Sequence, residues 1–342
     1  MRIASMGEGN TPLVESVSIG PRLGIRLFFK LEMCNPTGSY KDRFIAAEVS
    51  GLLERGVQAC IATSSGNTGA SLAAYCARNR IACAIFVNEF APAGKLQHMQ
   101  AHGARVFRVR DFVTSPDVTE RVYRRLRRMS DENGIPIVVS AFRYCPESMR
   151  GVQSISTEIH AQLNGAADHV FVPVGSGGLF TAVSRGFSAL PRKPRVHAVQ
   201  PEGCLTLVSA FREHRDDIRP VESTTRISGL SVPFDIDATT ALQELYRAGG
   251  NAIGVADEEA VAAQKMMLRE EGIWPEPAGA TALAGCIRAR RDGWLQEGST
   301  VVCLVTGHGF KDPDSLSEAA RENEIVLISE PELDSSLLEA RV

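Results

Sequence analysis

Short runs of apolar residues alternate along the chain with longer segments that have a helical periodicity. Most of these runs are continuously apolar, which is typical of parallel strands covered on both faces. The predicted strands are residues 60–63, 82–87, 105–109, 137–139, 169–174, 196–200 and 301–305. The predicted helices are residues 42–55, 68–78, 95–102, 118–132, 146–163, 179–189, 258–271 and 280–290. The repeated order of strand, helix and strand predicts a doubly wound α/β fold.

The composition is that of a globular protein with a substantial core. The chain has 342 residues, of which 44% are apolar and 23% are charged, and this length is typical of two domains. The formal net charge of −3 argues against a surface for nucleic acid or for an anionic membrane. The basic run at residues 121–128 is interpreted as the solvated face of one helix. We therefore expect no nucleic-acid partner and, since no apolar run approaches about 18 residues, no membrane span.

The cysteine pattern indicates a reducing compartment. The chain has eight cysteines, none of which forms a C-x-x-C pair, and most of them lie in apolar runs. A thiol in such a run behaves as a small hydrophobic group. Residues 1–13 also lack the apolar segment of a signal peptide. Together these features predict a cytoplasmic protein.

Four loops carry residue types that are suited to chemistry. The first is NPTGSYKDR at residues 35–43, where strong turn residues precede a single lysine, Lys41. Lys41 stands at the start of the predicted helix 42–55, so a rigid element holds it. A lysine amine held in this way is a candidate nucleophile for a carbonyl carbon, although most isolated lysines in turns are surface residues.

The second loop is TSSGNTGAS at residues 63–71, which follows a predicted strand and opens a helix. Backbone N–H groups at a helix N-terminus bind anions, and a carboxylate suits this loop of small polar side chains. The same residue types are also favoured N-caps, so both interpretations stay open at this point. The candidate residues are Ser64, Ser65, Asn67 and Thr68.

The third loop, VPVGSGGLFTAV at residues 172–183, places three glycines between a strand and a helix. This arrangement is typical of a phosphate site. Phe180 occupies the last glycine position of the dinucleotide fingerprint G-x-G-x-x-G, and no Gly-Lys-Ser/Thr of a Walker A loop follows. The loop therefore fits one phosphate better than a pyrophosphate.

The fourth loop, VVCLVTGHGFKD at residues 301–312, places Thr306 at the carboxyl end of a predicted strand. Ligands of parallel sheets bind at such ends, so Thr306 is a candidate polar contact. Elsewhere, His98 and His102 are spaced to share one helix face, but no third metal ligand is evident. We expect no metal site.

In their order along the chain, five motifs resemble those of fold-type II pyridoxal-phosphate enzymes. They are NPTGSYKDR, SSGNTG, GSGGL, EPAGA and TGHGFKD. Within that family the chain is similar to threonine synthases, chiefly through GEGNTPL at residues 7–13 and through TGHGFKD. The resemblance extends over roughly residues 7–312, and it implies pyridoxal 5'-phosphate as the cofactor.

The resemblance also implies a role for each matching residue. Lys41 matches the lysine that forms the Schiff base and then acts as general base, Asn67 matches the partner of the cofactor 3-hydroxyl, and Thr306 matches the group facing the pyridine nitrogen. The phosphate loop would be Gly175, Ser176, Gly177, Gly178 and Leu179. The substrate carboxylate would bind Ser64, Ser65 and Thr68, and Glu276 would lie near the cofactor. Ser148 stands where threonine synthases commonly have a phosphate-binding arginine, so Arg150, or Arg143, is the expected substitute.

The resemblance implies a two-domain α/β fold of the tryptophan synthase β type, with the cofactor in the cleft between the domains. We expect a discontinuous large domain from residues 1–46 and 147–320. We expect a small domain at residues 47–146 that carries the substrate carboxylate site, followed by a tail at residues 321–342. The roles of that tail and of residues 211–240 are not assigned.

The function implied by the resemblance is that of a lyase or synthase in amino-acid biosynthesis. It would deprotonate Cα of an amino acid and carry out β- or γ-elimination or replacement of a leaving group, such as a phosphorylated or acylated hydroxyl. Two alternatives are a β-replacement synthase of the cysteine-synthase type and a serine/threonine dehydratase. A third, of a different class, is a non-catalytic scaffold that binds the cofactor. A homodimer with a small amino-acid substrate is expected.

Overall fold

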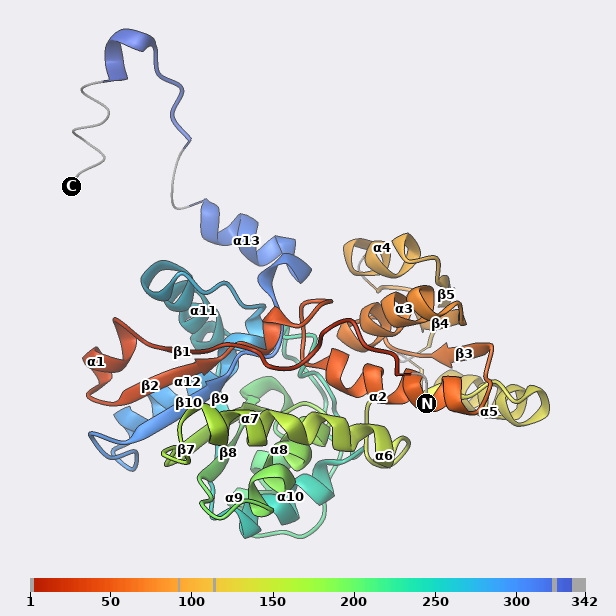
Figure 1. Ribbon diagram of the computed structural model, residues 1–342, viewed down its shortest axis with the longest axis horizontal. Helices are drawn as coiled ribbons and strands as arrows, with labels where there is room; N and C mark the ends of the chain where they lie inside the picture. Colours follow the sequence, from red (N-terminus) through yellow and green to blue (C-terminus); the bar gives the residue numbers. More distant parts are fainter. Residues whose placement is uncertain (1–2, 92, 113–114, 322–324, 334–342) are drawn as a thin grey trace.

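Two β-sheets form the framework of the computed structural model (Figure 1). The structure describes residues 3–91, 93–112, 115–321 and 325–333. The six-stranded sheet has the order β1-β2-β10-β7-β8-β9 and the four-stranded sheet has the order β5-β4-β3-β6. The larger sheet contains β1 (Leu13–Glu15), β2 (Arg26–Lys30), β7 (His169–Pro173), β8 (Arg195–Pro201), β9 (Ala252–Val255) and β10 (Thr300–Leu304). The smaller sheet contains β3 (Ala59–Ala62), β4 (Ala82–Asn88), β5 (Arg105–Val109) and β6 (Ile137–Val138).

Helices connect the strands and cover the sheets (Figure 1). The helices up to the end of the smaller sheet are α1 (Ile19–Leu23), α2 (Lys41–Glu54), α3 (Asn67–Asn79), α4 (Ala93–Ala101) and α5 (Pro116–Asn133). Those that follow are α6 (Pro146–Met149), α7 (Ser154–Gln162), α8 (Gly178–Ser188), α9 (Thr206–Arg212), α10 (Ala238–Arg247), α11 (Asp257–Glu271), α12 (Pro277–Arg291) and α13 (Pro313–Ala320). Short 3₁₀ turns are η1 (Glu32–Cys34), η2 (Arg150–Gln153), η3 (Glu202–Cys204), η4 (Gly309–Lys311) and η5 (Glu330–Glu332).

The strand direction determines where the candidate loops meet. β1 pairs antiparallel with β2, whereas the other neighbouring strands of both described sheets pair in parallel. Parallel strands present their carboxyl ends at one edge of a sheet. The loops that follow β3, β6, β7 and β10 therefore emerge at the carboxyl edges of the two sheets, and these are the loops that carry the candidate site residues.

Side chains of the larger sheet alternate between two apolar cores. In β7, Val170 and Val172 face a core that includes α7, α8 and α10, and that continues through α2 into the smaller sheet. Phe171 faces the opposite core, which α11 and α12 cover. All three side chains are fully buried. Strands covered on both faces have continuously apolar sequences, and this explains why β7 was predictable from its composition.

The predicted strands and helices are all present, with shifts of a few residues at most at their ends, except that one predicted helix is divided. The segment predicted as a helix at residues 146–163 forms α6, η2 and α7 in succession. Gly151 lies in the middle of it, and a Cβ atom there would approach the Arg43 carbonyl oxygen to 2.7 Å. Close packing against α2 therefore imposes a tighter turn at this point. The strands and α-helices that the sequence did not predict are β1, β2, β9, α1, α9, α10 and α13.

The predicted division at residues 46/47 and 146/147 separates the strands of the two sheets, and the domain boundaries themselves stay a prediction. Part of the predicted tail at residues 321–342 lies outside the described residues. Residues 325–333 extend away from the body of the molecule (Figure 1), and Ile325 and Leu327 are almost completely exposed.

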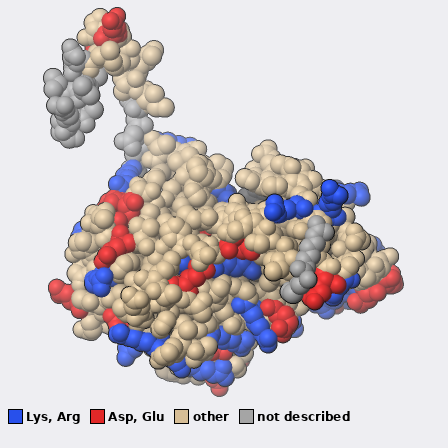
Figure 2. All heavy atoms as spheres, viewed as in Figure 1, with Lys and Arg blue, Asp and Glu red and all other residues tan. Residues whose placement is uncertain are grey.

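Basic and acidic side chains are interspersed on the face shown in Figure 2. Among the described residues, no helix is long and apolar enough to cross a membrane.

Two histidines form a buried pair in the larger sheet. His169 of β7 and His197 of β8 lie 2.9 Å apart between Nδ1 and Nε2, and Trp294 packs on His197 at 5.0 Å between ring centroids. The Asn251 backbone N–H donates to His197 Nδ1 at 3.0 Å. In the neutral ring His197 Nε2 therefore carries the hydrogen, and this N–H donates a hydrogen bond to His169 Nδ1. Both rings are neutral in this arrangement, and burial lowers the pKa of His169 and lowers that of His197 to about 3.

This pair predicts that the folded protein loses stability in acid. The unfolded chain takes up protons on both histidines near pH 6.5, whereas the folded protein takes one up on His197 only near pH 3. The free energy of unfolding should therefore fall between these values by about 1.4 kcal/mol per pH unit for each histidine protonated only in the unfolded chain. Urea unfolding of His197→Asn at pH 7 and pH 5 should show a smaller loss than the wild type. An equal loss in both proteins would contradict this assignment.

Candidate active site

Lys41 is the first residue of α2, directly after the turn at residues 35–40. Gly38 adopts φ +81° in that turn, a conformation that glycine accepts without strain. The carboxylate of Asp42 accepts hydrogen bonds from the Thr37 backbone N–H at 2.6 Å and from the Thr37 hydroxyl at 2.5 Å. Ser71 of α3 donates to the same carboxylate at 2.5 Å. The turn and the start of α2 are thus fixed to each other and to α3.

The amine of Lys41 is held from two sides. Its Nζ donates to Ser140 Oγ at 2.8 Å, and it lies 4.7 Å from the centroid of the Tyr40 ring. An aromatic face at that distance attracts a cation. Ser140 comes from the loop that follows β6 in the smaller sheet. The lysine on α2 and the end of the smaller sheet therefore meet at the Lys41 amine.

Ser140 also borders the predicted phosphate loop. A Cβ atom on Gly178 would lie 3.6 Å from the Ser140 carbonyl oxygen and 2.9 Å from Asp237 Oδ2. Asp237 is buried, and its carboxylate accepts hydrogen bonds from the backbone N–H groups of Phe142 at 2.7 Å and Arg143 at 3.0 Å. Burial raises the pKa of Asp237, while these two backbone hydrogen bonds and the charge of Lys41 oppose the rise. Through these contacts Asp237 holds residues 140–143 next to the glycine loop.

The glycine loop has the form of an anion cradle. Gly177 adopts φ +98° and precedes α8, and a Cβ atom there would lie 2.7 Å from the Asp237 carbonyl oxygen. Only glycine fits such a position. The first N–H groups of an α-helix have no acceptor within the helix, so they are available to an anion. Helix α8 begins at Gly178, which places these N–H groups in the predicted GSGGL loop.

Thr306 lies two residues beyond the end of β10, which is an interior strand of the larger sheet. Its side chain is 4% exposed. Its carbonyl oxygen accepts a hydrogen bond from the Tyr40 backbone N–H at 3.1 Å, and Ser39 forms a bridge with Gly307. These backbone contacts fix the loop that carries Lys41 against the strand end that carries Thr306.

Asn67 and Glu276 meet next to Thr306. Asn67 opens α3, and its Nδ2 donates to Glu276 Oε1 at 2.8 Å. A Cβ atom on Gly307 would lie 2.2 Å from that same Oε1 and 3.1 Å from Asn67 Nδ2. The structure therefore brings together two residues that the sequence analysis assigned to the cofactor site from motifs 209 positions apart.

The predicted carboxylate loop lies at the N-terminus of α3. Ser64 and Ser65 are half-buried and precede the helix, whereas Thr68 is buried in its first turn. The Gly66 N–H donates to Ser64 Oγ at 3.3 Å, so part of the polar capacity of this loop is used locally. A Cβ atom on Gly69 would lie 2.2 Å from the Ser64 carbonyl oxygen. The loop is folded tightly over the start of α3.

Arg150, the expected substitute for a substrate-binding arginine, lies in a different setting. It is the first residue of η2, its side chain is 65% exposed, and it forms an ion pair with Glu147 at 2.9 Å. Ser148 donates to Glu48 Oε2 at 2.5 Å. Arg143 is exposed and lies over the Tyr144 ring at 5.9 Å. None of the contacts that the structure describes for these three side chains involves Lys41 or the glycine loop.

Two residues of this site were missed by the sequence analysis. Ser140 could have been noticed, because it follows a predicted strand at residues 137–139 and so stands at the carboxyl end of that strand. Asp237 lies in residues 211–240, a polar segment without a recognisable pattern. No local signal distinguishes this aspartate from Asp235, two positions away.

The contact between Lys41 and Ser140 predicts a measurable effect of Ser140→Ala. A hydrogen bond to a charged group contributes about 1.5–3 kcal/mol, so catalytic turnover should fall at least about tenfold. Ser148→Ala is the matched control, since Ser148 bonds to Glu48 instead. Equal turnover for wild type and Ser140→Ala would argue that Ser140 has only a packing role.

The donor set fits pyridoxal 5'-phosphate. The site offers a lysine amine, an amide at Asn67, a buried hydroxyl at Thr306 and a glycine loop at a helix N-terminus. Gly177 and Gly307 leave room where any side chain would collide with the surrounding residues. These are the groups that a ring with a hydroxyl, a nitrogen, an aldehyde and one phosphate requires.

Comparison with known proteins agrees with this donor set. A family model described as pyridoxal-phosphate dependent enzyme matches residues 4–307. The threonine synthase of Methanocaldococcus jannaschii is 36% identical over 332 residues, which cover 94% of this chain and 80% of that protein. The threonine synthase of Bacillus sp. (strain ULM1) is 33% identical, with 91% of this chain and 85% of that protein covered.

Solved structures share the fold. Maize serine racemase superposes with a TM-score of 0.79 at 24% identity, covering 92% of each chain. The processed form of threonine deaminase isoform 2 from Solanum lycopersicum gives a TM-score of 0.76 at 22% identity, with 92% of this chain and 84% of that chain covered. These likenesses confirm the predicted fold-type II architecture. The chain belongs to the family of pyridoxal-phosphate dependent enzymes.

Proposed function

We propose that this chain is a threonine synthase-type enzyme that removes a proton from Cα of an amino acid and eliminates or replaces a leaving group on its side chain. The observation that carries the proposal is the position of the Lys41 amine. It lies 2.8 Å from Ser140 Oγ, and Ser140 in turn borders Gly178 of the glycine loop. A base in this position can reach a substrate attached to the cofactor when the phosphate of the cofactor is bound at the N-terminus of α8.

In the proposed reaction, separate residues bind the cofactor and transfer the proton at Cα. Lys41 holds the cofactor before the substrate arrives and then moves the proton at Cα. Gly175, Ser176, Gly177, Gly178 and Leu179 hold the phosphate group. Asn67 contacts the ring hydroxyl and Thr306 contacts the ring nitrogen. When bound, pyridoxal 5'-phosphate supplies an electron sink for the bond that breaks at Cα.

The substrate carboxylate is proposed to bind at the N-terminus of α3, through Ser64, Ser65 and Thr68. The position of this loop at the start of α3 supports the proposal, because the first N–H groups of this 13-residue helix have no acceptor within the helix and are available to an anion. The Asp42–Ser71 hydrogen bond links α3 to the start of α2. A carboxylate held on α3 is thereby positioned relative to the Lys41 amine.

The proposed leaving group is a phosphate, with O-phosphohomoserine as the first substrate to test. The support is the identity of 31–36% to threonine synthases over at least 90% of this chain. Arg150 is the proposed phosphate contact. To reach the substrate, Arg150 would have to turn away from Glu147. The Arg150–Glu147 ion pair is exposed and therefore weak, so a substrate phosphate can replace Glu147 as the partner of Arg150.

One observation favours a second candidate, β-replacement or elimination on an acylated or free hydroxy amino acid. Ser148, where the resemblance to threonine synthases implies an arginine, donates to the buried Glu48 carboxylate. A serine bonded to an acid cannot grip an anion in the bidentate way of an arginine. A substrate without a phosphate needs no such grip.

A substrate panel separates these candidates. The holoenzyme is mixed with O-phosphohomoserine, O-phosphoserine, O-acetylserine or threonine, and phosphate, acetate, keto acids and new amino acids are measured. Release of phosphate with formation of threonine from O-phosphohomoserine alone supports the first candidate. Turnover of O-acetylserine or threonine instead supports the second. Absence of turnover for all four, with unchanged cofactor spectra, would point to the non-catalytic scaffold.

Arg150→Ala tests the phosphate contact. Losing a charged hydrogen bond to the substrate should raise KM for O-phosphohomoserine at least about tenfold, with a smaller effect on kcat. Arg143→Ala is the matched control, as an exposed arginine that lies over the Tyr144 ring. If only Arg143→Ala raises KM, Arg143 and not Arg150 binds the substrate phosphate. If neither variant raises KM, neither arginine binds it, and the proposed phosphate contact is wrong.

We also propose a cytoplasmic homodimer. The cysteines that the structure describes are all free thiols, which supports a reducing compartment. The exposed apolar residues at 325–328 offer surface that association could bury. Light scattering on the full chain at several concentrations measures the assembly directly, and a monomer at all concentrations would exclude the dimer.

A further inference from the structure

Three cysteines converge in the core of the smaller sheet. Cys60 on β3 and Cys83 on β4 are partners in the parallel pairing of these strands. Cys76 on α3 packs over them, with its Sγ 3.5 Å from that of Cys60. All three Sγ atoms lie within 4.8 Å of one another, and the residues are 1%, 8% and 1% exposed for Cys60, Cys83 and Cys76. The three cysteines come from β3, β4 and α3, and none of them has a role in the proposed function.

The cluster lies far from the candidate active site along each element. Cys60 and Cys83 are the second residues of their strands, whereas the loop with Ser64 and Ser65 follows the carboxyl end of β3. Cys76 lies near the C-terminal end of α3, whose N-terminus carries Asn67. The three thiols therefore stand at the amino edge of the sheet, opposite the edge where substrate is proposed to bind.

We propose that Cys60, Cys76 and Cys83 form a three-thiolate site for a trivalent thiophilic species, of which arsenite is the probe. A thiolate bond of about 2.3 Å in the pyramidal geometry of trivalent arsenic places the sulfur atoms about 3.5 Å apart. The 3.5 Å between Cys60 Sγ and Cys76 Sγ matches that value, and the other separations are at most 4.8 Å. Small rotations of the side chains suffice to close the site.

Charge selects the trivalent species. Three thiolates carry a charge of −3, so a divalent cation leaves −1 and a monovalent cation leaves −2 in an apolar core. Burial of an unpaired charge is strongly unfavourable. The carboxylate of Glu48 also acts on Cys60 and disfavours added negative charge there. A trivalent centre leaves the site neutral.

The binding step balances without an oxidant or a base. A thiol buried in apolar surroundings keeps its proton, and the pKa values of Cys60 and Cys76 are raised, whereas hydrogen bonds with these two thiols lower the pKa of Cys83. The step is written for three neutral thiols, and a Cys83 thiolate would first take up one proton from water. Arsenous acid reacts as As(OH)₃ + 3 R–SH → As(SR)₃ + 3 H₂O. Three As–O bonds and three S–H bonds break, three As–S bonds form, the thiol protons leave in water, and arsenic stays trivalent. The product ties β3, β4 and α3 together.

The test is arsenite binding to the reduced holoenzyme, followed by native mass spectrometry and by X-ray absorption at arsenic. The expected result is one arsenic per chain with three sulfur ligands. Cys76→Ala and, independently, Cys83→Ser should weaken binding at least tenfold while the cofactor absorbance stays unchanged. The matched control is Cys303→Ala, which removes one thiol of the buried pair formed by Cys303 on β10 and Cys286 on α12 and should retain full binding.

The remaining outcomes decide against the site. Equal binding by wild type and both cluster variants places arsenic elsewhere, for example on the exposed Cys34, and overturns the proposal. Two sulfur ligands in place of three also overturn it. Zinc serves as the divalent control and should bind at least tenfold more weakly than arsenite. If zinc binds more tightly, the neutral trigonal site is wrong. None of these results depends on the substrate of the enzyme.

Discussion

Replacing Lys41 with alanine should remove the visible absorption band of the holoenzyme and lower turnover at least about a thousandfold. Lys41 is the amine at the junction of α2, the 140–143 loop and the glycine loop. Without it the protein can neither form the imine with the cofactor nor move the proton at Cα in the proposed reaction. Absorbance spectra of the reconstituted variant and single-turnover assays with the best substrate of the panel measure both losses.

Lys41→Arg is the matched control for charge. An arginine keeps a cation near Tyr40 and Ser140, but it forms no imine and does not release its proton. Its spectrum should match that of Lys41→Ala, while its thermal stability should stay closer to the wild type. A visible band or substantial turnover in Lys41→Arg would mean that another amine holds the cofactor.

The contiguous parts of the site were predictable from the sequence, because each motif contains its own physical explanation. The turn before Lys41 depends on Thr37, Gly38 and Asp42, which are neighbours in the chain. The glycine loop is likewise local, since a strand, three glycines and a helix follow one another. Such features leave a pattern in a short window of sequence.

The long-range parts of the site were not predictable, because their cause lies in contacts between distant segments. Lys41 and Ser140 are 99 positions apart, and Asp237 reaches Phe142 across 95 positions. Serine and aspartate are common in loops, so neither residue is conspicuous before the fold brings its partner near. The same holds for Arg150, whose sequence position suggested a substrate contact but whose side chain pairs with Glu147.

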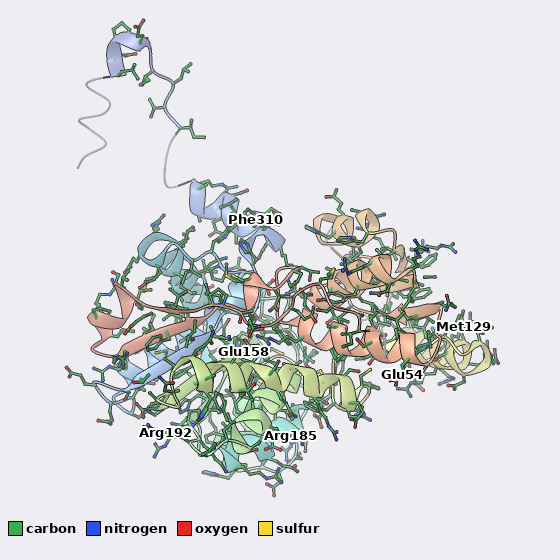
Figure 3. The ribbon with its side chains drawn as sticks, in the orientation of Figure 1. Glu54, Met129, Glu158, Arg185, Arg192 and Phe310 are labelled. Atoms are coloured by element: carbon green, nitrogen blue, oxygen red, sulfur yellow. The ribbon has the colours of Figure 1, made fainter. Side chains whose placement is uncertain are left out.

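The strand β2 shows the same limit in the fold. It runs Arg-Leu-Phe-Phe-Lys, and its last residue, Lys30, is fully buried. A buried lysine is tolerated because Nζ donates to the Thr11 carbonyl oxygen, Glu158 and Gln162 at 2.7–3.0 Å. Glu158 lies 128 positions away on α7, near the centre of the molecule in Figure 3. A short segment bounded by two charges therefore gave no strand signal.

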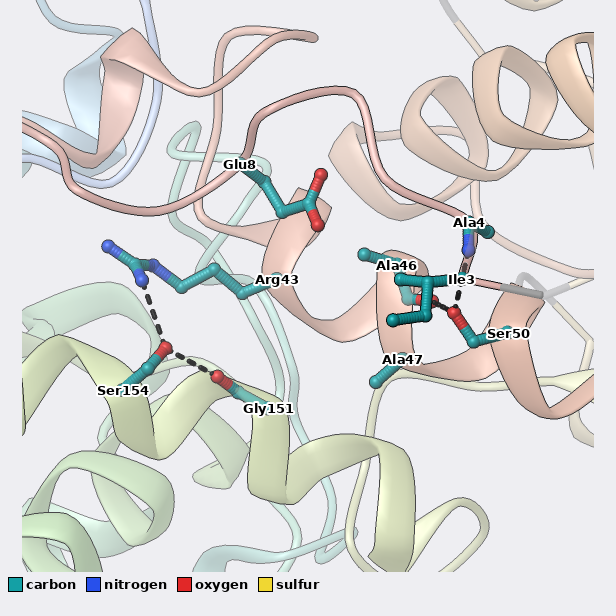
Figure 4. A pocket seen from close by; sticks show the side chains of 9 residues that line it. All are labelled: Ile3, Ala4, Glu8, Arg43, Ala46, Ala47, Ser50, Gly151 and Ser154. Carbon is teal, nitrogen blue, oxygen red and sulfur yellow. Dashed lines mark hydrogen bonds between the residues drawn. The ribbon is translucent and has the colours of Figure 1, made fainter. Parts of the chain in front are cut away.

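Arg43, two residues after Lys41, belongs to the same buried network. Its guanidinium donates to Glu32 through Nε and Nη2, both at 2.7 Å, and to Glu158 through Nη1 at 2.5 Å and Nη2 at 2.8 Å. Figure 4 shows its further contact with Ser154, at 2.9 Å. Burial would raise the pKa of Glu158, but hydrogen bonds from Arg43 and Lys30 lower it to about 2. The network pairs two carboxylates, Glu32 and Glu158, with two basic side chains, Arg43 and Lys30, so their formal charges balance.

Replacing Arg43 with methionine should destabilise the protein by about 3–5 kcal/mol, because removal of one partner from a buried ion pair leaves its counter-charge uncompensated. Glu32 is 0% exposed and cannot recover its charge balance from solvent. Arg124→Met is the matched control: the Arg124–Glu120 pair is about 70% exposed on both sides, and its loss should change stability by less than about 0.5 kcal/mol. Urea unfolding of the holoenzymes measures both changes.

The double variant Arg43→Met/Glu32→Gln distinguishes charge from packing. It removes the buried carboxylate together with its cation and leaves Lys30 and Glu158 as a neutral pair. If uncompensated charge causes the loss, the double variant should be more stable than Arg43→Met alone, even though it lacks more hydrogen bonds. If the double variant is less stable, the contribution of Arg43 is its packing and its hydrogen bonds. In either case α2 should loosen in Arg43→Met, and because Lys41 opens that helix, cofactor affinity should fall with stability.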